Sequence, residues 1–143
     1  MVLRGWIRIF AAMNQALTDK EILIFGLRHI YGRLIGDGYE VLSVRDEPEI
    51  DPQIVARKED LLYFFVVRTA VYPGKGSWPS LSRIKQISDH AKLHHAKTVF
   101  AFLGLTNADA TTEAEKSKLC KGGTFLIDFS GFQDLGRNPE SNN

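Results

Sequence analysis

Two carboxylates and one arginine in segment 49–69 are the residues of this chain best placed to do chemistry. The segment reads EIDPQIVARKEDLLYFFVVRT, with Glu49 and Asp51 at its entrance and Arg68 near its end. The apolar runs on either side of a charged tripeptide at 58–60 predict two antiparallel strands joined by a tight turn. Such a hairpin brings its two ends together. We therefore expect Asp51 and Arg68 on neighbouring strands, with their side chains on the same face.

The acidic pair has two interpretations. Residues 49 and 51 share a face if the chain is extended, so Asp51 and Glu49 are the candidate ligands for a hard divalent cation such as Mg²⁺ or Mn²⁺. Pro48 and Pro52 lie beside them and equally favour a turn or a solvated acidic loop. No cofactor is expected unless the first interpretation holds.

The order of these motifs resembles the PD-(D/E)xK, or restriction-endonuclease-like, superfamily. The resemblance is strongest to small bacterial endonuclease-like proteins, in which a G-E-I-D motif precedes a hairpin that carries V-E-V-K. It covers about residues 18–105 and implies an αβββαβ core, with a central mixed β-sheet flanked by helices. The matching positions are 49–51 for E-I-D, 63–65 for the apolar lead-in, 66–69 for E-V-K-T, and Lys85 with Gln86 for a Lys-Gln pair on the next helix.

Two departures from the family pattern bear on catalysis. Val66 stands where the family has its second acid, and a valine cannot bind a metal. Arg68 stands where the family has a lysine, and its guanidinium stays protonated, although it can grip a phosphate. The resemblance therefore implies a degenerate site at Asp51 and Arg68, in a pseudoenzyme that binds nucleic acid or another phosphate-bearing ligand.

Two alternatives remain open. The first is a protein-interaction or oligomerisation module on the same fold, with a homodimer or another protein as partner. The second is an active Mg²⁺-dependent endonuclease with a relocated carboxylate. Glu49 is its leading substitute ligand, and Glu21 on the first helix is another by resemblance.

Hydrophobic periodicity predicts an α+β protein. Thr18 and Glu21 have the spacing of a capping box, so a helix should begin there and end at the Gly-Asp-Gly of 36–38. Its apolar face is predicted at Ile22, Phe25, Ile30, Leu34 and Ile35. Strands are predicted at 39–44, 53–57 and 61–72, a second helix at 81–97, buried strands at 98–105 and 124–132, and a short helix within 111–120. Segment 61–72 is apolar on both faces, which predicts a central strand.

The loop 73–80 and the second helix contain the remaining candidate contacts to nucleic acid. Trp78 in the loop could stack on a base or simply anchor the loop to the core. The helix has its own apolar positions at Leu81, Ile84, Ile87, Ala91 and Leu93, and its other faces are largely basic. The predicted nucleic-acid contacts are Arg68, Lys75, Trp78, Arg83, Lys85 and Gln86, and an ordinary solvated surface is the alternative.

His90 and His94 are four residues apart on the same helix, a spacing that can present two imidazoles to zinc. No nearby cysteine or third ligand completes such a site in the sequence. A solvated or partly buried helix face is the alternative interpretation.

Composition sets limits on the class of protein. With 143 residues, 44% of them hydrophobic, the chain should form one domain, predicted at 18–135, with an N-terminal extension at 1–17 and a flexible tail at 136–143. A net charge of +1 gives no overall field, so any binding to DNA or RNA should be local and weak. No membrane partner is expected. The single cysteine, Cys120, excludes an internal disulfide and fits the cytoplasm.

Overall fold

The computed structural model describes residues 15–134, which form a five-stranded mixed sheet with helices on both faces. The strand order is β1-β2-β3-β4-β5, in which β3 and β4 are parallel and the other neighbours are antiparallel. The strands are β1 (Glu40–Val44), β2 (Ile54–Lys58), β3 (Leu61–Val71), β4 (Ala96–Asn107) and β5 (Phe125–Asp134). The helices are α2 (Asp19–Gly36), α3 (Leu81–Leu93) and the short 3₁₀ helix η1 (Ala114–Ser117). The predicted α+β class, its αβββαβ order and the flanked mixed sheet are confirmed.

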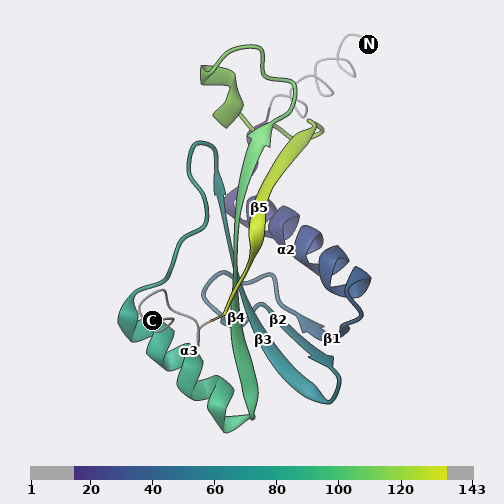
Figure 1. Cartoon of the computed structure of the whole chain (residues 1–143). Coiled ribbons are helices and arrows are strands. Elements are labelled where there is room, and N and C mark those ends of the chain that lie inside the picture. Colours follow the sequence, from purple (N-terminus) through teal and green to yellow (C-terminus); the bar gives the residue numbers. More distant parts are fainter. Residues whose placement is uncertain (1–14, 135–143) are drawn as a thin grey trace, which may run out of the picture.

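The central strand β3 supplies both halves of the core, because its side chains alternate between the two faces of the sheet. Val67 packs under α2 with Leu27 and Ile30, whereas Val66 packs under α3 with Ile87 and Phe100. Figure 1 shows α2 and α3 on the two sides of the sheet, and β4 and β5 extending beyond them to the tip that carries η1. The prediction that segment 61–72 is central is confirmed.

The hairpin that positions Asp51 and Arg68 closes at the predicted turn. Glu59 and Asp60 have φ angles of 52° and 64°, and they join β2 to β3 as a two-residue connection. Positive φ at both central residues matches the twist of antiparallel strands, which is why short hairpins favour such turns. The register then runs from Lys58 opposite Leu61 to Ile54 opposite Phe65.

The predicted helix faces were partly wrong. The capping box of α2 is confirmed, since Thr18 and Glu21 bond each other's backbone, but Leu23, Leu27, Ile30 and Leu34 form the buried face, and Ile35 is half exposed. Nearly every position in 22–27 is apolar, so spacing alone could not identify the buried face. On α3 the buried residues are Ile87 and Ala91, while the terminal residues Leu81 and Leu93 are exposed.

Two element predictions need correction. The last strand, predicted as buried, alternates between half-buried and exposed residues because β5 is an edge strand. The second helix ends at Leu93, before the predicted limit of 97, and β4 already begins at Ala96. His95 has a φ of 56°, which breaks the helical backbone. The predicted tail at 136–143 and most of the N-terminal extension lie outside the described residues.

Candidate functional site: a carboxylate shared by two arginines

Asp51 lies just before β2, and a buried glutamine holds it there. Gln53 donates from Nε2 to Asp51 Oδ1 at 2.7 Å and to the Ile50 carbonyl at 2.8 Å, and its Oε1 accepts from the Val67 backbone N–H at 2.8 Å. Gln53 is fully buried and its own backbone N–H bonds the Phe65 carbonyl. The glutamine thus extends the β2–β3 pairing by side-chain bonds and fixes Asp51 opposite the end of β3.

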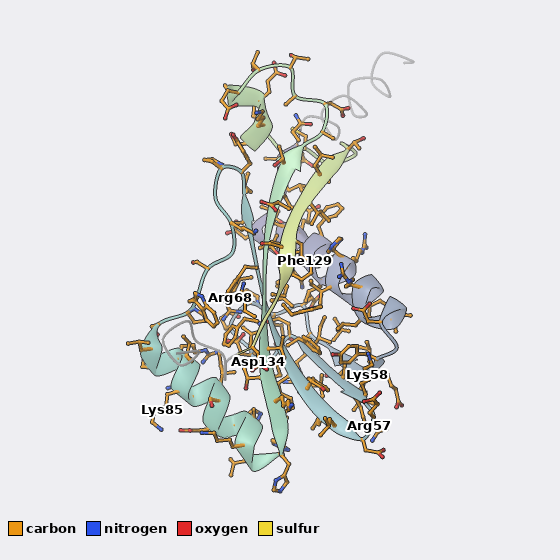
Figure 2. All side chains as sticks on the ribbon, in the orientation of Figure 1. Arg57, Lys58, Arg68, Lys85, Phe129 and Asp134 are labelled. Atoms are coloured by element: carbon orange, nitrogen blue, oxygen red, sulfur yellow. The ribbon has the colours of Figure 1, made fainter. Side chains whose placement is uncertain are left out.

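Arg68 meets this carboxylate in a two-pronged contact. Its Nη1 donates to Asp51 Oδ1 at 2.8 Å and its Nη2 to Oδ2 at 2.9 Å. The planar guanidinium matches the planar carboxylate, so this geometry is among the strongest of protein ion pairs. Figure 2 shows Arg68 reaching from the sheet toward the side that α3 covers. The expectation that Asp51 and Arg68 meet on one face is confirmed, although Asp51 precedes β2 rather than lying in it.

A second arginine reaches the same carboxylate from α3. Ser80 caps the helix by accepting a bond from the Arg83 backbone N–H, which places Arg83 in the first turn. Arg83 donates from Nε to Asp51 Oδ2 at 3.0 Å and from Nη2 to the Glu49 carbonyl at 2.8 Å. Its Nη1 lies 3.5 Å from the Gln86 amide oxygen. Arg83 therefore ties α3 to the segment before β2.

The three charged side chains differ in their exposure to solvent. The Asp51 side chain is 1% exposed, whereas those of Arg68 and Arg83 are 26% and 38% exposed. Burial raises the pKa of Asp51, but the hydrogen bonds and charge of Arg68, together with the bonds from Gln53 and Arg83, outweigh burial and hold that pKa below its ordinary value. Both guanidinium groups are always charged. Two cations around one anion leave a net charge of +1, on the solvent side of the cluster.

These residues do not fit a divalent metal. Both Asp51 oxygens already accept hydrogen bonds from arginine, and two fixed cations beside the carboxylate would repel an added one. Glu49 is exposed and contributes its backbone carbonyl to Arg83. Val66 on β3 is fully buried against Ile87 and Phe100 and supplies no ligand. Within residues 15–134, no three histidine, cysteine or acidic side chains gather as a metal site.

The other predicted contacts divide into those near the cluster and those held elsewhere. A cavity of about 250 Å³ borders it, lined by Asp51, Arg83, Gln86, Ile87 and His90. Lys85 pairs with Asp89 at 2.7 Å and lies on the outer side of α3 (Figure 2). Lys75 reaches across to β5, where it bonds Ser130 at 2.6 Å. The structure brings Arg68, Arg83 and Gln86 together around Asp51, but not Lys75 or Lys85.

The aromatic and histidine candidates have clear packing partners. Trp78 lies against Phe100 and Phe102, with ring centroids 4.6 Å and 5.0 Å away, and still is 47% exposed. His90 and His94 contact each other and both pack on Phe64, at 5.5 Å and 5.7 Å. Both histidines are exposed, and within residues 15–134 no third ligand joins them, so the arrangement supports a solvated helix face rather than a zinc site.

Glu21 belongs to a motif that predicts its contacts, whereas Gln53 does not. Glu21 accepts hydrogen bonds from the backbone N–H and the hydroxyl of Thr18 in the capping box. These bonds, chiefly the one from the backbone, hold the pKa of Glu21 below its ordinary value. Glu21 is on α2, across the sheet from Asp51. Gln53 was not among the predicted site residues, because a glutamine before a strand has no distinctive pattern. Only its position between Asp51 and an apolar strand could have suggested an inward-facing amide.

Comparison with known proteins gives a family but no activity. No curated protein matches the sequence. Among the residues that the structure describes, no helix has the length and apolar character needed to cross a membrane. Residues 20–135 match a domain of unknown function, DUF8840, and this range includes the whole sheet, α3, all of α2 but its first residue, and the Asp51 cluster. The chain therefore belongs to the DUF8840 family.

Proposed function

We propose that this protein is a non-hydrolytic relative of the PD-(D/E)xK nucleases that binds a phosphate group of nucleic acid at Arg68 and Arg83. The observation that carries the proposal is the sharing of one buried carboxylate by two partly exposed arginines. Asp51 neutralises one charge and holds both guanidinium groups in place. The remaining positive charge faces solvent and is preorganised for an anion.

The position of Arg83 supports the same conclusion. Arg83 lies in the first turn of α3, where no acidic residue is present. The N-terminal end of a helix carries a partial positive charge, so a cation there is unfavourable and an anion favourable. The single negative charge of Asp51 offsets this unfavourable placement of Arg83 only in part. A phosphate at the cluster would add the second negative charge that two arginines can accept.

The absence of hydrolysis follows from the residues on β3. Val66 is buried under α3 and supplies no carboxylate, and Arg68 cannot accept a proton from water. The cluster can thus position a phosphate but has no group that activates an attacking water. The single half-buried cysteine fits a reducing compartment, and we place the protein in the cytoplasm as part of this proposal.

Fluorescence polarisation with labelled oligonucleotides tests the binding. Arg83→Gln should weaken binding roughly tenfold, because it removes one charged hydrogen bond to phosphate while Arg68 still pairs with Asp51. With only two cations engaged, log affinity should fall with log salt at a slope of about −1.5. Arg33→Gln is the matched control, since Arg33 pairs with Asp37 on α2, across the sheet. Binding that ignores Arg83→Gln would contradict the proposal.

The same preparation should leave DNA and RNA uncut in Mg²⁺ or Mn²⁺. The sharpest comparison is the double variant Val66→Glu with Arg68→Lys. It gives the chain the charge pattern of the PD-(D/E)xK nucleases but forces an acid into the core beside Phe100. We expect that double variant to be destabilised rather than activated. Cleavage by the unaltered protein that Asp51→Ala abolishes would show that catalysis survives, with Glu49 as the first substitute ligand to test.

Assembly through a second copy of the chain is the other candidate function. A groove of about 520 Å³ lies between α2 and β1, on the face opposite α3, and is lined by Ile24, Leu27, Arg28, Tyr31, Val44 and Asp46. Tyr31 and Val44 are half exposed there. Arg28 and Asp46 carry opposite charges, so two copies related by a two-fold axis could pair them reciprocally.

A further inference from the structure

The loop after β3 passes directly over Arg68. Gly76 donates its backbone N–H to the Leu103 carbonyl at 2.9 Å. A Cβ atom at Gly76 would stand 1.9 Å from the Arg68 carbonyl oxygen and 2.8 Å from the Arg68 Cβ. No side chain fits in that space. The backbone of the loop is therefore fixed against the backbone of the arginine that binds Asp51.

This contact brings the backbone at Trp78 close to Arg68. Trp78 is two residues beyond Gly76, so their Cα atoms are separated by at most about 7 Å. The indole packs on Phe102, and Phe102 is the register partner of Arg68 on the neighbouring strand, about 4.8 Å away. Two independent contacts thus put the aromatic ring and the guanidinium on the same face of the sheet.

The indole keeps surface free for a ligand. The rings of Phe100 and Phe102 are inclined to it by 52° and 69°, so neither lies flat on its face. Trp78 remains 47% exposed although these two contacts anchor it. An anchored, half-exposed aromatic ring loses little conformational entropy when a base stacks on it.

On the basis of the proposed function, we infer that the ligand is single-stranded nucleic acid, with a base stacked on Trp78 and its neighbouring phosphate at Arg68 and Arg83. Bases in a duplex are stacked on each other and do not offer their faces, whereas unpaired bases do. Cationic groups and an exposed aromatic ring on the same face are the combination that binds single strands. Sequence-specific readout is not required, because every base has a π face.

Tryptophan fluorescence reports on the stacking directly. The chain has two tryptophans, so Trp6→Phe leaves Trp78 as the only one. A short single-stranded oligonucleotide should quench this fluorescence and bind at least about tenfold more tightly than a blunt duplex of the same length. Trp78→Leu should weaken single-strand binding about five- to hundredfold, and Trp78→Tyr should retain most of it, because a phenol ring still stacks.

Two controls separate this inference from the proposed function. Tyr31→Leu removes a ring of similar exposure, 45%, from α2 on the other face, and should leave binding unchanged. Thermal unfolding of Trp78→Leu checks that the variant remains folded. Equal binding of duplex and single strand, or full binding by Trp78→Leu, overturns the stacking inference but not the arginine site. If Trp78→Leu loses binding but Arg83→Gln binds as tightly as the unaltered protein, the stacking inference stands and the proposed function is overturned.

Discussion

At the scale of single residues, the hydrogen bonds of Asp51 distinguish it from a catalytic aspartate that binds a metal. A catalytic aspartate must present free oxygens to a cation from solution. Here Arg68, Arg83 and Gln53 occupy them with hydrogen bonds of 2.7–3.0 Å. The arginine at position 68 binds the carboxylate through two parallel hydrogen bonds, which a lysine could not form. Asp51 is thus a structural residue that positions two cations.

Asp51→Asn should destabilise the protein by about 2–4 kcal/mol, because it leaves two arginines around a neutral group. Both arginines keep some access to water, so the loss stays at the low end for broken buried pairs. The folded-state pKa of Asp51 is lowered, so its contribution is present above the ordinary value of about 3.9 and is lost as pH falls through the lower folded-state value. Denaturant unfolding between pH 7 and pH 2 measures both effects.

The control for this prediction is Asp37→Asn. Asp37 pairs with Arg33 on the exposed surface of α2, and removing such a pair should cost less than about 1 kcal/mol. The acid-induced loss of stability should be smaller in Asp51→Asn than in the unaltered protein. An Asp51→Asn variant with unchanged stability at pH 7 would mean that the cluster contributes nothing to the fold.

At the scale of elements, α2 lies unusually close to β3. A Cβ atom at Gly26 would stand 1.9 Å from Thr69 Oγ1 and 3.1 Å from Thr69 Cβ. Among the described residues, this Oγ1 is also the one buried side-chain oxygen or nitrogen without a hydrogen-bond partner. The absent side chain at Gly26 lets the helix approach the strand just after Arg68. The approach of α2 therefore helps to fix the end of β3 that bears the site.

Gly26→Ala should destabilise the protein by about 1–3 kcal/mol through overpacking, although alanine favours helices. Thr69→Ala removes the nearest atom and an unsatisfied hydroxyl, so Gly26→Ala should cost less in that background. Gly32→Ala is the control in the same helix. No atom lies within 4 Å of its added Cβ, so it should stabilise by up to about 1 kcal/mol. Equal effects at Gly26 and Gly32, measured by chemical denaturation, would refute the close contact.

At the scale of the whole molecule, the arginine cluster and the groove between α2 and β1 lie on opposite faces of the sheet. β1 is short, and its register shifts around Leu42, which makes continuous pairing with another strand unfavourable. A contact between two copies would instead use side chains around the groove. The net charge of +1 opposes such association only weakly.

If a second copy occupies the groove, sedimentation velocity over a concentration series should show a monomer–dimer equilibrium. Val44→Lys should shift it to monomer, because it places a charge in the apolar groove. Arg28→Glu should weaken association, and adding Asp46→Arg should restore it by exchanging the two charges. Leu126→Lys, at an exposed position on β5, is the control. A monomer at every concentration would remove assembly from the candidate functions.

The sequence by itself determined most of the secondary structure. The capping box at Thr18, the two-residue turn and the doubly apolar strand each encode their structure locally, and the order of elements followed from them. The sequence did not determine which faces of the helices are buried. Which of many apolar residues on α2 face the sheet depends on how closely the helix can approach, and that is set by Gly26 and Thr69.

The sequence also indicated that Asp51 and Arg68 would meet, because hairpin register is a local property. Only the tertiary structure decided what they do. Arg83 comes from a helix 32 residues further along the chain, and Gln53 acts through a buried amide that no pattern distinguishes. A metal site and an ion-pair cluster contain the same aspartate. The choice between them depends on which charges long-range packing brings within 3 Å of it, and that information is not present in any single segment.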